Sequence, residues 1–390
     1  MAAPRSIAFV APRYAEGATV GGAETLLRQL AERLAAAGRR VTFLATCARD
    51  HFTWANEWPP GRREVRGVTV ELFPVNGDRD TARFLARQTA IDRGEALDRA
   101  AQLEWMRHSV NSDALIARLR AEASRFDRII AGPYLFGLIY HAAQVAPEKT
   151  LLVPCLHDEP FARQDVIREM FAGVRGCLFN SEPERDLAAR LLGFEQRRGV
   201  VVGMGLEPFE ADPAAFARRR GLSKPYVFYC GRREAGKGTP LLTDYLRAFR
   251  ERTGRDVELV CAGHGPLDAL PFVRDVGFLS EAEKREAMAG AVAFVHPSAR
   301  ESFGIVLLES FLAGTPGLVH AAGAVLRWQC ERSGGGLWFR HYPDFEAELA
   351  LLLDNPALRD RLGAQGRAFA RRAYAWPAVE ARLLHGLEVL

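Results

Sequence analysis

Lysine is nearly missing from this sequence: Lys149, Lys224, Lys237 and Lys284 occur among 52 basic residues, and arginine supplies the rest. The formal net charge is only +4, which excludes the strongly basic surface typical of proteins that bind nucleic acid. Genomic base composition is the simplest cause of the arginine bias. Even so, arginine is the default cation here, so each lysine is worth inspecting for a specific role.

Other features are absent too. The six cysteines form no C-x-x-C pair, which predicts buried thiols in a reducing compartment. No H-E-x-x-H motif or Cys/His cluster occurs, so we expect no metal and no cofactor. No run approaches the roughly 20 apolar residues of a membrane span, and the apolar part of residues 1–12 is too short for a signal peptide. We therefore expect a cytoplasmic protein, and peripheral attachment to the inner face of a membrane stays open.

The length of 390 residues predicts two domains. The chain begins with a strand at 7–11, a glycine-containing loop, a helix over 23–37 and a strand at 41–46, which indicates a parallel sheet. A glycine- and proline-rich stretch at 203–213 indicates a linker. After it, a second series of strands and helices starts at 226. We predict an α/β fold in which two Rossmann-like βαβ domains face each other across a cleft.

The expected boundaries are 1–203 for the N-terminal domain, 204–375 for the C-terminal domain and 376–390 for a last helix that could cross back to the first domain. Residues 81–124 are charged and helical in pattern. Two interpretations of them stay open, a solvated helical insertion and a lobe that faces an acceptor. The other strands are expected at 68–74, 128–131, 150–156, 177–180, 200–202, 226–230, 257–262, 291–296, 317–320 and 336–339.

The segment 293–316 joins an apolar strand, a polar loop and a helix that we expect to begin near Ser302 and Phe303. The unpaired N–H groups at a helix start carry about half a positive charge and bind anions such as a diphosphate. The backbone amides expected at this start are those of Ser302, Phe303, Gly304 and Ile305.

Glu301 and Glu309 lie eight residues apart in this segment, which is roughly 12 Å along a helix axis. That distance is similar to the reach from a hexose across a diphosphate to a ribose. One carboxylate could bind sugar hydroxyls and the other ribose hydroxyls. The spacing alone equally fits an acid at a helix start and a charge on a helix face.

Arg232 and Lys237 follow the expected strand at 226–230, and strand ends of this kind bind ligands in doubly wound sheets. Two cations there would offset the charge of a departing diphosphate. The segment is no P-loop, because a glycine follows Lys237. Gly21 and Gly22 precede the first helix, where small residues let the backbone approach a phosphate, although such a pair is more often a turn.

His157 ends another expected strand and could position an acceptor hydroxyl or donate a hydrogen bond to a donor sugar. Asp158 and Glu159 beside it are candidate acceptor contacts. A single histidine in a loop is more often structural, so both interpretations stay open. No G-x-S-x-G nucleophile motif occurs in the chain.

Together these segments resemble the retaining GT-B glycosyltransferases of family 4. The spacing from Glu301 to Glu309 is similar to that family's E-x7-E motif, and the first half matches more loosely, through VGGAE at 20–24 and LHDEPF at 156–161. The matching segments of the second half are GRREAGKG at 231–238, CAGHGP at 261–266, VGFLS at 276–280 and HPSARESFGIVLLESFLAGTP at 296–316.

The resemblance implies a role for each matching residue. Arg232 and Lys237 would bind the diphosphate, Glu301 the donor sugar and Glu309 the ribose, with His157 near the sugar and acceptor. The implied catalytic residues are therefore Glu301, His157, Arg232 and Lys237. The other implied donor contacts are Gly22 near the phosphates, Gly277 and Phe278 at the base, and Ser302, Phe303, Gly304 and Ile305 around the sugar and phosphate.

The implied reaction moves a sugar from a UDP- or GDP-linked donor to a glycan, lipid-linked or small-molecule acceptor, with retention of anomeric configuration and without a metal. The departing phosphate helps to take the acceptor proton, so no strong protein nucleophile is expected. After Pro316 the chain departs from the family's Gly-Gly-x-x-Glu segment and has GLVHAAGAVLRWQCERSGGG instead. That departure leaves the identity of the donor sugar open.

Three other functions remain as alternatives. A sugar-nucleotide 2-epimerase of similar fold would need further acids and histidines around the sugar. A non-catalytic protein that binds sugar nucleotides would not need Glu301, Arg232 and Lys237 together. A NAD-dependent dehydrogenase is disfavoured because the first loop lacks the G-x-G-x-x-G spacing.

Overall fold

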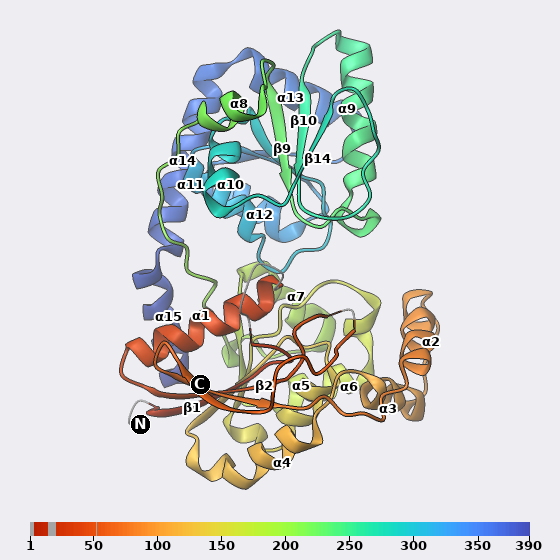
Figure 1. Cartoon of the computed structure of the whole chain (residues 1–390), viewed down its shortest axis with the longest axis vertical. Coiled ribbons are helices and arrows are strands. Elements are labelled where there is room, and N and C mark those ends of the chain that lie inside the picture. Colours follow the sequence, from red (N-terminus) through yellow and green to blue (C-terminus); the bar gives the residue numbers. More distant parts are fainter. Residues whose placement is uncertain (1–3, 15–20, 52) are drawn as a thin grey trace. The chain divides into compact units, whose positions relative to one another are not determined.

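The computed structural model describes residues 4–14, 21–51 and 53–390 (Figure 1). Contacts between residues divide the chain into two compact units. Met1–Met204 and Val379–Leu390 form the N-terminal unit, and Gly205–Ala378 form the C-terminal unit. The last residues of the chain therefore belong to the N-terminal unit.

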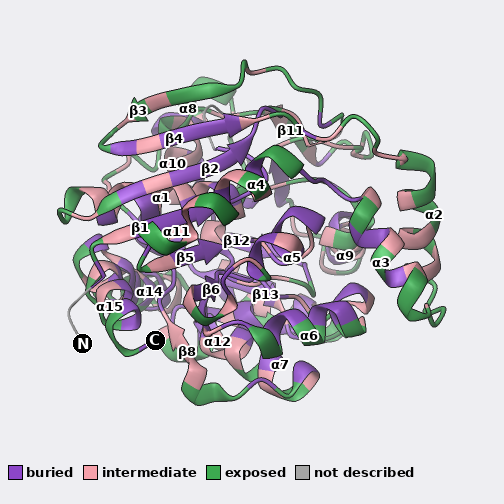
Figure 2. Ribbon diagram, turned by 90° about the horizontal axis from the view of Figure 1, so that it is seen from below, coloured by how far each residue is buried: buried purple, intermediate pink, exposed green. Residues whose placement is uncertain are grey.

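The N-terminal unit is built on a sheet with the strand order β3-β4-β2-β1-β5-β6-β7-β8. Its central strands are buried, whereas β3 is mostly exposed at one edge (Figure 2). The strands are β1 (Ser6–Val10), β2 (Arg40–Thr46), β3 (Gly61–Val65), β4 (Val68–Phe73), β5 (Arg128–Ala131), β6 (Thr150–Leu152), β7 (Gly176–Phe179) and β8 (Gly199–Val201).

One pair of strands departs from the expected parallel sheet. Strand β3, which the sequence pattern did not predict, runs antiparallel to β4, while the other neighbouring strands are parallel. Arg66 and Gly67 join the two strands with positive φ angles of 50° and 80°. Two such residues form the tight hairpin turn whose twist matches that of the strands.

Eight helices of the described chain contribute to the N-terminal unit. The expected helical stretch 81–124 is three helices, whose N-caps Asp80, Asp98 and Ser112 each accept a backbone N–H. The helices are α1 (Gly22–Ala36), α2 (Thr81–Asp92), α3 (Arg99–His108), α4 (Asp113–Glu122), α5 (Gly137–Ala143), α6 (Asp165–Gly173), α7 (Glu182–Leu192) and α15 (Trp376–Val389).

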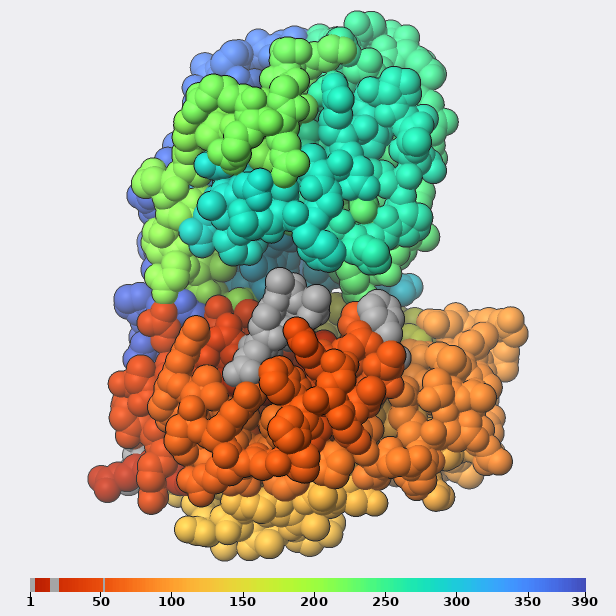
Figure 3. Space-filling view, in the orientation of Figure 1, coloured from red at the N-terminus to blue at the C-terminus, as the bar shows by residue number. Residues whose placement is uncertain are grey.

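The α2–α3 lobe is anchored rather than wholly solvated. Trp105 and Met106 of α3 are fully buried in the core beneath the sheet, where α3 packs on α5 and α6. Helix α2 packs on α3 and lies at the edge of the unit (orange in Figures 1 and 3), and its Leu85 is exposed. The interpretation as a solvated insertion therefore fits α2 and not α3.

The C-terminal unit is built on a parallel sheet with the order β11-β10-β9-β12-β13-β14. Its strands are β9 (Tyr226–Cys230), β10 (Glu258–Ala262), β11 (Val273–Gly277), β12 (Ala293–His296), β13 (Gly317–His320) and β14 (Gly336–Phe339). Its helices are α8 (Ala215–Arg220), α9 (Thr239–Thr253), α10 (Glu281–Ala289), α11 (Ile305–Ala313), α12 (Ala324–Ser333), α13 (Tyr342–Asp354) and α14 (Pro356–Tyr374).

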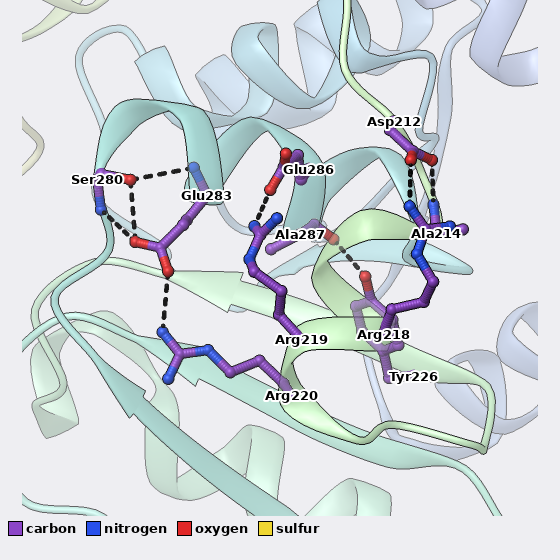
Figure 4. A network of polar contacts seen from close by, with 10 residues as sticks. All are labelled: Asp212, Ala214, Arg218, Arg219, Arg220, Tyr226, Ser280, Glu283, Glu286 and Ala287. Carbon is purple, nitrogen blue, oxygen red and sulfur yellow. Dashed lines mark hydrogen bonds and ion pairs between the residues drawn. The ribbon is translucent and has the colours of Figure 1, made fainter.

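The short helix α8, which follows the expected linker, is held against α10 by ion pairs (Figure 4). Arg219 pairs with Glu286, and Arg220 lies 3.1 Å from Glu283. The hydroxyl of Tyr226, at the start of β9, donates to the carbonyl of Ala287 at 2.8 Å. These contacts make residues 214–220 part of the C-terminal unit.

Candidate functional site

The candidate site of the C-terminal unit lies where the strand order changes direction. β9 and β12 are neighbours, but β9 leads to β10 and β11 on one side, whereas β12 leads to β13 and β14 on the other. In open α/β sheets, ligands bind outside the carboxyl ends of the strands at such a switch point. Arg232 and Lys237 follow β9, and Glu301 follows β12. The topology therefore brings the predicted cations and the first acid of the E-x7-E motif to one edge.

Lys237 and Glu301 form an ion pair at this edge. Lys237 Nζ donates to Glu301 Oε1 at 2.6 Å, and the two side chains are only 21% and 17% exposed. His296, the last residue of β12, places Nε2 3.6 Å from the same oxygen. Burial lowers the pKa of His296 to about 4, although the Glu301 carboxylate opposes this, and Lys237 lowers it further; the imidazole is therefore neutral at pH 7. A lysine and a neutral histidine thus flank the Glu301 carboxylate.

The loop that carries Lys237 is held against the exit of β12. Gly238 has a φ of +74°, and a Cβ there would lie 2.8 Å from the carbonyl oxygen of Pro297. A larger residue at this position would therefore push the two loops apart. On the other side, Tyr229 donates its hydroxyl to the carbonyl of Arg232 at 2.6 Å. The side chain of Arg232 is exposed, with its guanidinium 3.8 Å from the carboxylate of Glu234.

The helix of the E-x7-E motif begins later than predicted. Helix α11 starts at Ile305, so Ser302 and Phe303 lie in the turn before it. The reason is Gly304, whose φ of +72° places it in the left-handed region, which a right-handed helix cannot include. Leu307 N already donates to Gly304 O at 3.1 Å, so the first amides of the helix are those of Ile305 and Val306.

This later start also corrects the spacing argument. Glu301 lies in the loop rather than on the helix, so the axial rise of a continuous helix does not give its distance from Glu309. Phe303 is buried, and its carbonyl accepts a hydrogen bond from Gln329 Nε2 of α12 at 2.5 Å. The hydrogen bond from α12 therefore holds the turn that precedes α11.

Glu309 lies on α11 and pairs with Lys284 of α10, Nζ to Oε1, at 2.9 Å. Lys284 also lies 3.1 Å from Glu281. Burial raises the pKa of Glu309, and the ammonium of Lys284 opposes that rise. Glu309 Oε2 is buried and has no hydrogen-bond partner among the described residues. One oxygen of this carboxylate therefore makes no hydrogen bond to the described residues.

The predicted base-binding residues lie at the end of β11, where Gly277 is the last residue of the strand and Phe278 follows it. Gly277 has a φ of +63° and donates its N–H to Asp275 at 2.9 Å, while Asp275 pairs with Arg233 at 2.7 Å. Phe278 is 71% exposed, and its ring stacks on His264 with centroids 6.2 Å apart and planes 10° apart. An exposed stacked pair at a sheet edge offers a flat aromatic surface.

The glycine loop of the N-terminal unit is only partly described, because residues 15–20 lie outside the described residues. Gly21 is the N-cap of α1, and Gly22 is its first residue. A Cβ on Gly21 would lie 2.7 Å from the carboxylate of Glu24. Glu24 is buried and pairs with Arg13 at 2.6 Å. A salt bridge that the sequence pattern did not indicate thus supports the start of α1.

The three predicted acceptor residues lie together after β6, in the N-terminal unit. His157 is half-buried, with Nδ1 3.8 Å from Glu159 Oε1. Glu159 accepts a hydrogen bond from the Tyr134 hydroxyl at 2.5 Å. Asp158 pairs with Arg163 and, at 3.2 Å, with Arg190. These ion pairs already give Asp158 a structural role, whereas the imidazole of His157 has a neighbouring acid that could orient it.

The described residues hold neither a metal-binding cluster nor a membrane-spanning helix. No group of three or more histidine, cysteine, aspartate and glutamate side chains in this part of the chain could hold a metal ion. Nor does the described chain include a helix that is both long and apolar enough to pass through a membrane.

Two residues that contact the predicted acids were missed by the sequence pattern. His296 beside Glu301 and Lys284 beside Glu309 were not predicted as site residues. The signal for Lys284 was present, since it is one of the chain's few lysines. His296 gives no such signal, because only the fold of the loop after β12 brings its side chain next to Glu301.

Comparison with known proteins identifies the C-terminal unit most directly. Residues 214–369 match the family model described as Glycosyl transferases group 1. Over 387 residues the chain is 27% identical to a phosphatidyl-myo-inositol mannosyltransferase of Mycobacterium tuberculosis, covering 95% of this chain and 93% of that protein. A GDP-mannose-dependent alpha-(1-6)-phosphatidylinositol dimannoside mannosyltransferase of the same species is 32% identical over 141 residues, which are 32% of this chain and 36% of that protein.

Solved structures share the fold over nearly the whole chain. Anabaena Alr3699/HepE, in complex with UDP and glucose, matches with a TM-score of 0.71 at 16% identity, covering 98% of this chain and 99% of that one. Sucrose-phosphate synthase of Thermosynechococcus elongatus matches with a TM-score of 0.70 at 17% identity, covering 96% of both chains.

Proposed function

We propose that this chain, whose residues 214–369 match the glycosyl transferases group 1 family, is a retaining glycosyltransferase with the GT-B fold. From this premise we infer which donor and acceptor it uses and which residues bind them. The donor is a hexose on a nucleoside diphosphate, with GDP-mannose and UDP-glucose as the first candidates. The acceptor is a lipid-linked alcohol. The similar proteins support both choices. Two of them are named as mannosyltransferases that act on phosphatidylinositol lipids, and one solved structure contains UDP and glucose.

One observation carries the assignment of residues. The pair of Lys237 and Glu301, 2.6 Å apart, lies at the switch point of the C-terminal sheet with a neutral histidine behind it. In the proposed complex, Lys237 turns to the diphosphate and Glu301 accepts hydroxyls of the donor sugar. Arg232, whose side chain is exposed on the same loop, is the second cation for the diphosphate.

The proposed chemistry follows from these charges. As the bond between the anomeric carbon and the phosphate oxygen breaks, negative charge grows on the diphosphate, and Lys237, Arg232 and the first amides of α11 stabilise it. The departing phosphate oxygen takes the acceptor proton, and the acceptor oxygen bonds to the same face of the sugar. His157 hydrogen-bonds the acceptor hydroxyl. Because protein cations balance the diphosphate, the reaction would need no metal ion.

Glu309 is proposed to bind the ribose through its buried, unpartnered Oε2, while Lys284 holds Oε1. Gly277 and Phe278 would bind the base. The amides near Gly21 and Gly22 in the N-terminal unit are proposed to approach the phosphates. A lipid-linked acceptor would bring the enzyme to the surface of a membrane.

A direct test incubates the protein with nucleotide sugars, among them GDP-mannose and UDP-glucose, with and without EDTA. Released nucleoside diphosphate is measured, first alone and then with phosphatidylinositol vesicles. Chelator-resistant release that the vesicles accelerate, together with a glycosylated lipid, is the expected result. Interconversion of the sugar without nucleotide release would indicate an epimerase, and binding without turnover would indicate an inert binding protein.

A further inference from the structure

A buried carboxylate at the start of α7 holds the loop that carries His157. Glu184 is 1% exposed and is the third residue of α7, whose N-cap is Ser181. In a capping box the acid at this position accepts the N–H of the N-cap. Here Glu184 also accepts the N–H of Asn180 at 2.5 Å and, from 28 residues upstream, the N–H of Leu156 at 2.7 Å. The acid thus ties the exit of β6 to the start of α7.

The tied segment is bent in a way that needs such support. Cys155 has a φ of +53°, in the left-handed region that residues other than glycine rarely adopt. Asn180, whose own N–H is accepted by Glu184, places its Nδ2 3.5 Å from Cys155 Sγ. The bend turns the N–H of Leu156 toward Glu184, and His157 is the next residue. The direction of the His157 side chain therefore depends on this bend.

Helix α7 holds the loop on both sides of His157. Before it, Glu184 accepts the Leu156 N–H, and after it, Arg190 pairs with Asp158 at 3.2 Å. Asp158 is also held by Arg163, so the contact after His157 is shared. Among the described residues, Glu184 is the one side chain that accepts the N–H of Leu156 before His157. A change at Glu184 should therefore move the histidine more than a change at Arg190.

We propose that Glu184 is a positioning residue for His157: its carboxylate fixes the backbone at Leu156 and so directs the imidazole toward the acceptor. The inference rests on the proposed function, because His157 contacts the acceptor only there. A carboxylate suits this place because both of its oxygens are acceptors, whereas an amide has only one acceptor oxygen. Burial raises the pKa of Glu184, and the backbone N–H groups of Asn180, Leu156 and Ser181 oppose that rise. Each oxygen accepts a backbone N–H, which is the arrangement that stabilises the ionised carboxylate.

The experiment compares Glu184→Gln with Glu182→Gln in the full chain. Glu182 lies in the same helical turn and loses the same charge, but it is half-buried rather than buried. Glu184→Gln should lower kcat about tenfold to a hundredfold, since misplacing a reacting group by about 1 Å costs up to a hundredfold. The donor KM should change less than about twofold, because the proposed donor contacts are elsewhere. Glu182→Gln should retain the wild-type kcat.

A double-mutant cycle with His157→Ala separates positioning from a general loss of structure. If Glu184 acts through His157, the double variant is no slower than His157→Ala alone, whereas independent effects would multiply. Hydrogen exchange at the Leu156 amide gives a readout that does not depend on activity, and it should be faster in Glu184→Gln. Should that variant fail to fold, Glu184→Asp keeps the charge, withdraws it from Leu156 and should show the same kinetic coupling.

Multiplying effects, or a wild-type kcat with a deprotected Leu156 amide, would overturn the positioning role. The proposed function has a separate outcome. If the wild type transfers sugar and Lys237→Met does not, while Glu184→Gln behaves like the wild type, only the role of Glu184 is wrong. If the wild type releases no nucleotide from any donor, the proposed function itself is wrong.

Discussion

Replacing Lys237 by methionine should separate catalysis from stability. Methionine keeps most of the length of the side chain and removes the charge, which leaves Glu301 beside the neutral His296. The loss of one preorganised cation from the place where charge develops costs about 2.7–4 kcal/mol of transition-state stabilisation. We therefore expect kcat to fall by a factor of about a hundred to a thousand.

The effect on folding should be smaller than the effect on kcat. Breaking a fully buried pair costs about 3–5 kcal/mol, whereas exposed pairs contribute about 0–1 kcal/mol. Lys237 and Glu301 are 21% and 17% exposed, so solvent screens the pair in part. We expect the free energy of unfolding to fall by about 1–2 kcal/mol, which leaves a domain of ordinary stability folded at 25 °C.

Lys224 provides a matched control. It lies in the same unit and pairs with Asp256 at the same 2.6 Å, but the two side chains are 45% and 51% exposed. Lys224→Met should change the free energy of unfolding by less than about 1 kcal/mol and leave kcat unaltered. The assay combines steady-state release of nucleoside diphosphate with urea unfolding of the same preparations. A kcat for Lys237→Met within twofold of the wild type would refute the assigned role.

Three further predictions follow from the C-terminal unit. Glu309→Gln should raise the Kd for the nucleoside diphosphate about tenfold or more and abolish discrimination against 2′-deoxy and 3′-deoxy nucleotides, measured by calorimetry. Phe278→Ser should weaken nucleotide binding about twofold to tenfold in the same assay, because one aromatic stacking surface is lost. The pKa of His296 falls to about 4, so the imidazole stays neutral in the fold but takes a proton in the unfolded chain below about pH 6.5. The free energy of unfolding should therefore fall by about 3 kcal/mol between pH 6.5 and 4, and His296→Asn should lose that part of the dependence in urea titrations.

The sequence pattern predicted apolar strands better than charged strands. β9 and β13 have the predicted bounds of 226–230 and 317–320, because each is a short apolar run inside its sheet. β3 and β11, which were missed, each form one edge of a sheet and have the charged sequences GRREV and VRDVG. The opposite edges, β8 and β14, are apolar and were predicted at 200–202 and 336–339. Charged residues on an edge strand, where one side faces water, remove the hydrophobic signal on which the prediction depends.

The errors at the candidate site have a different cause, because they concern contacts between distant segments. The motif located Glu301 and Glu309 but not where the helix begins, since Gly304 can adopt either hand of backbone. The contact of Glu184 with Leu156 spans 28 residues and depends on a left-handed bend at Cys155 that no local pattern announces. Sequence reasoning thus identified candidate residues, and the fold was needed to show their partners.

Both acids of the E-x7-E motif pair with a lysine, although lysine is rare in this sequence. Arginine is the usual base in this chain, yet both acids of the E-x7-E motif pair with lysines, Glu301 with Lys237 and Glu309 with Lys284. A guanidinium would grip both oxygens of a carboxylate in a bidentate fork, whereas an ammonium is a compact point charge that can leave one oxygen unbound. Glu309 has one such oxygen, buried and without a partner among the described residues. A lysine partner therefore lets the carboxylate accept hydroxyls of the sugar or the ribose more readily than an arginine partner would. For the same reason Lys284→Arg should impair nucleotide binding, which titration of the nucleoside diphosphate would measure, although the charge is unchanged.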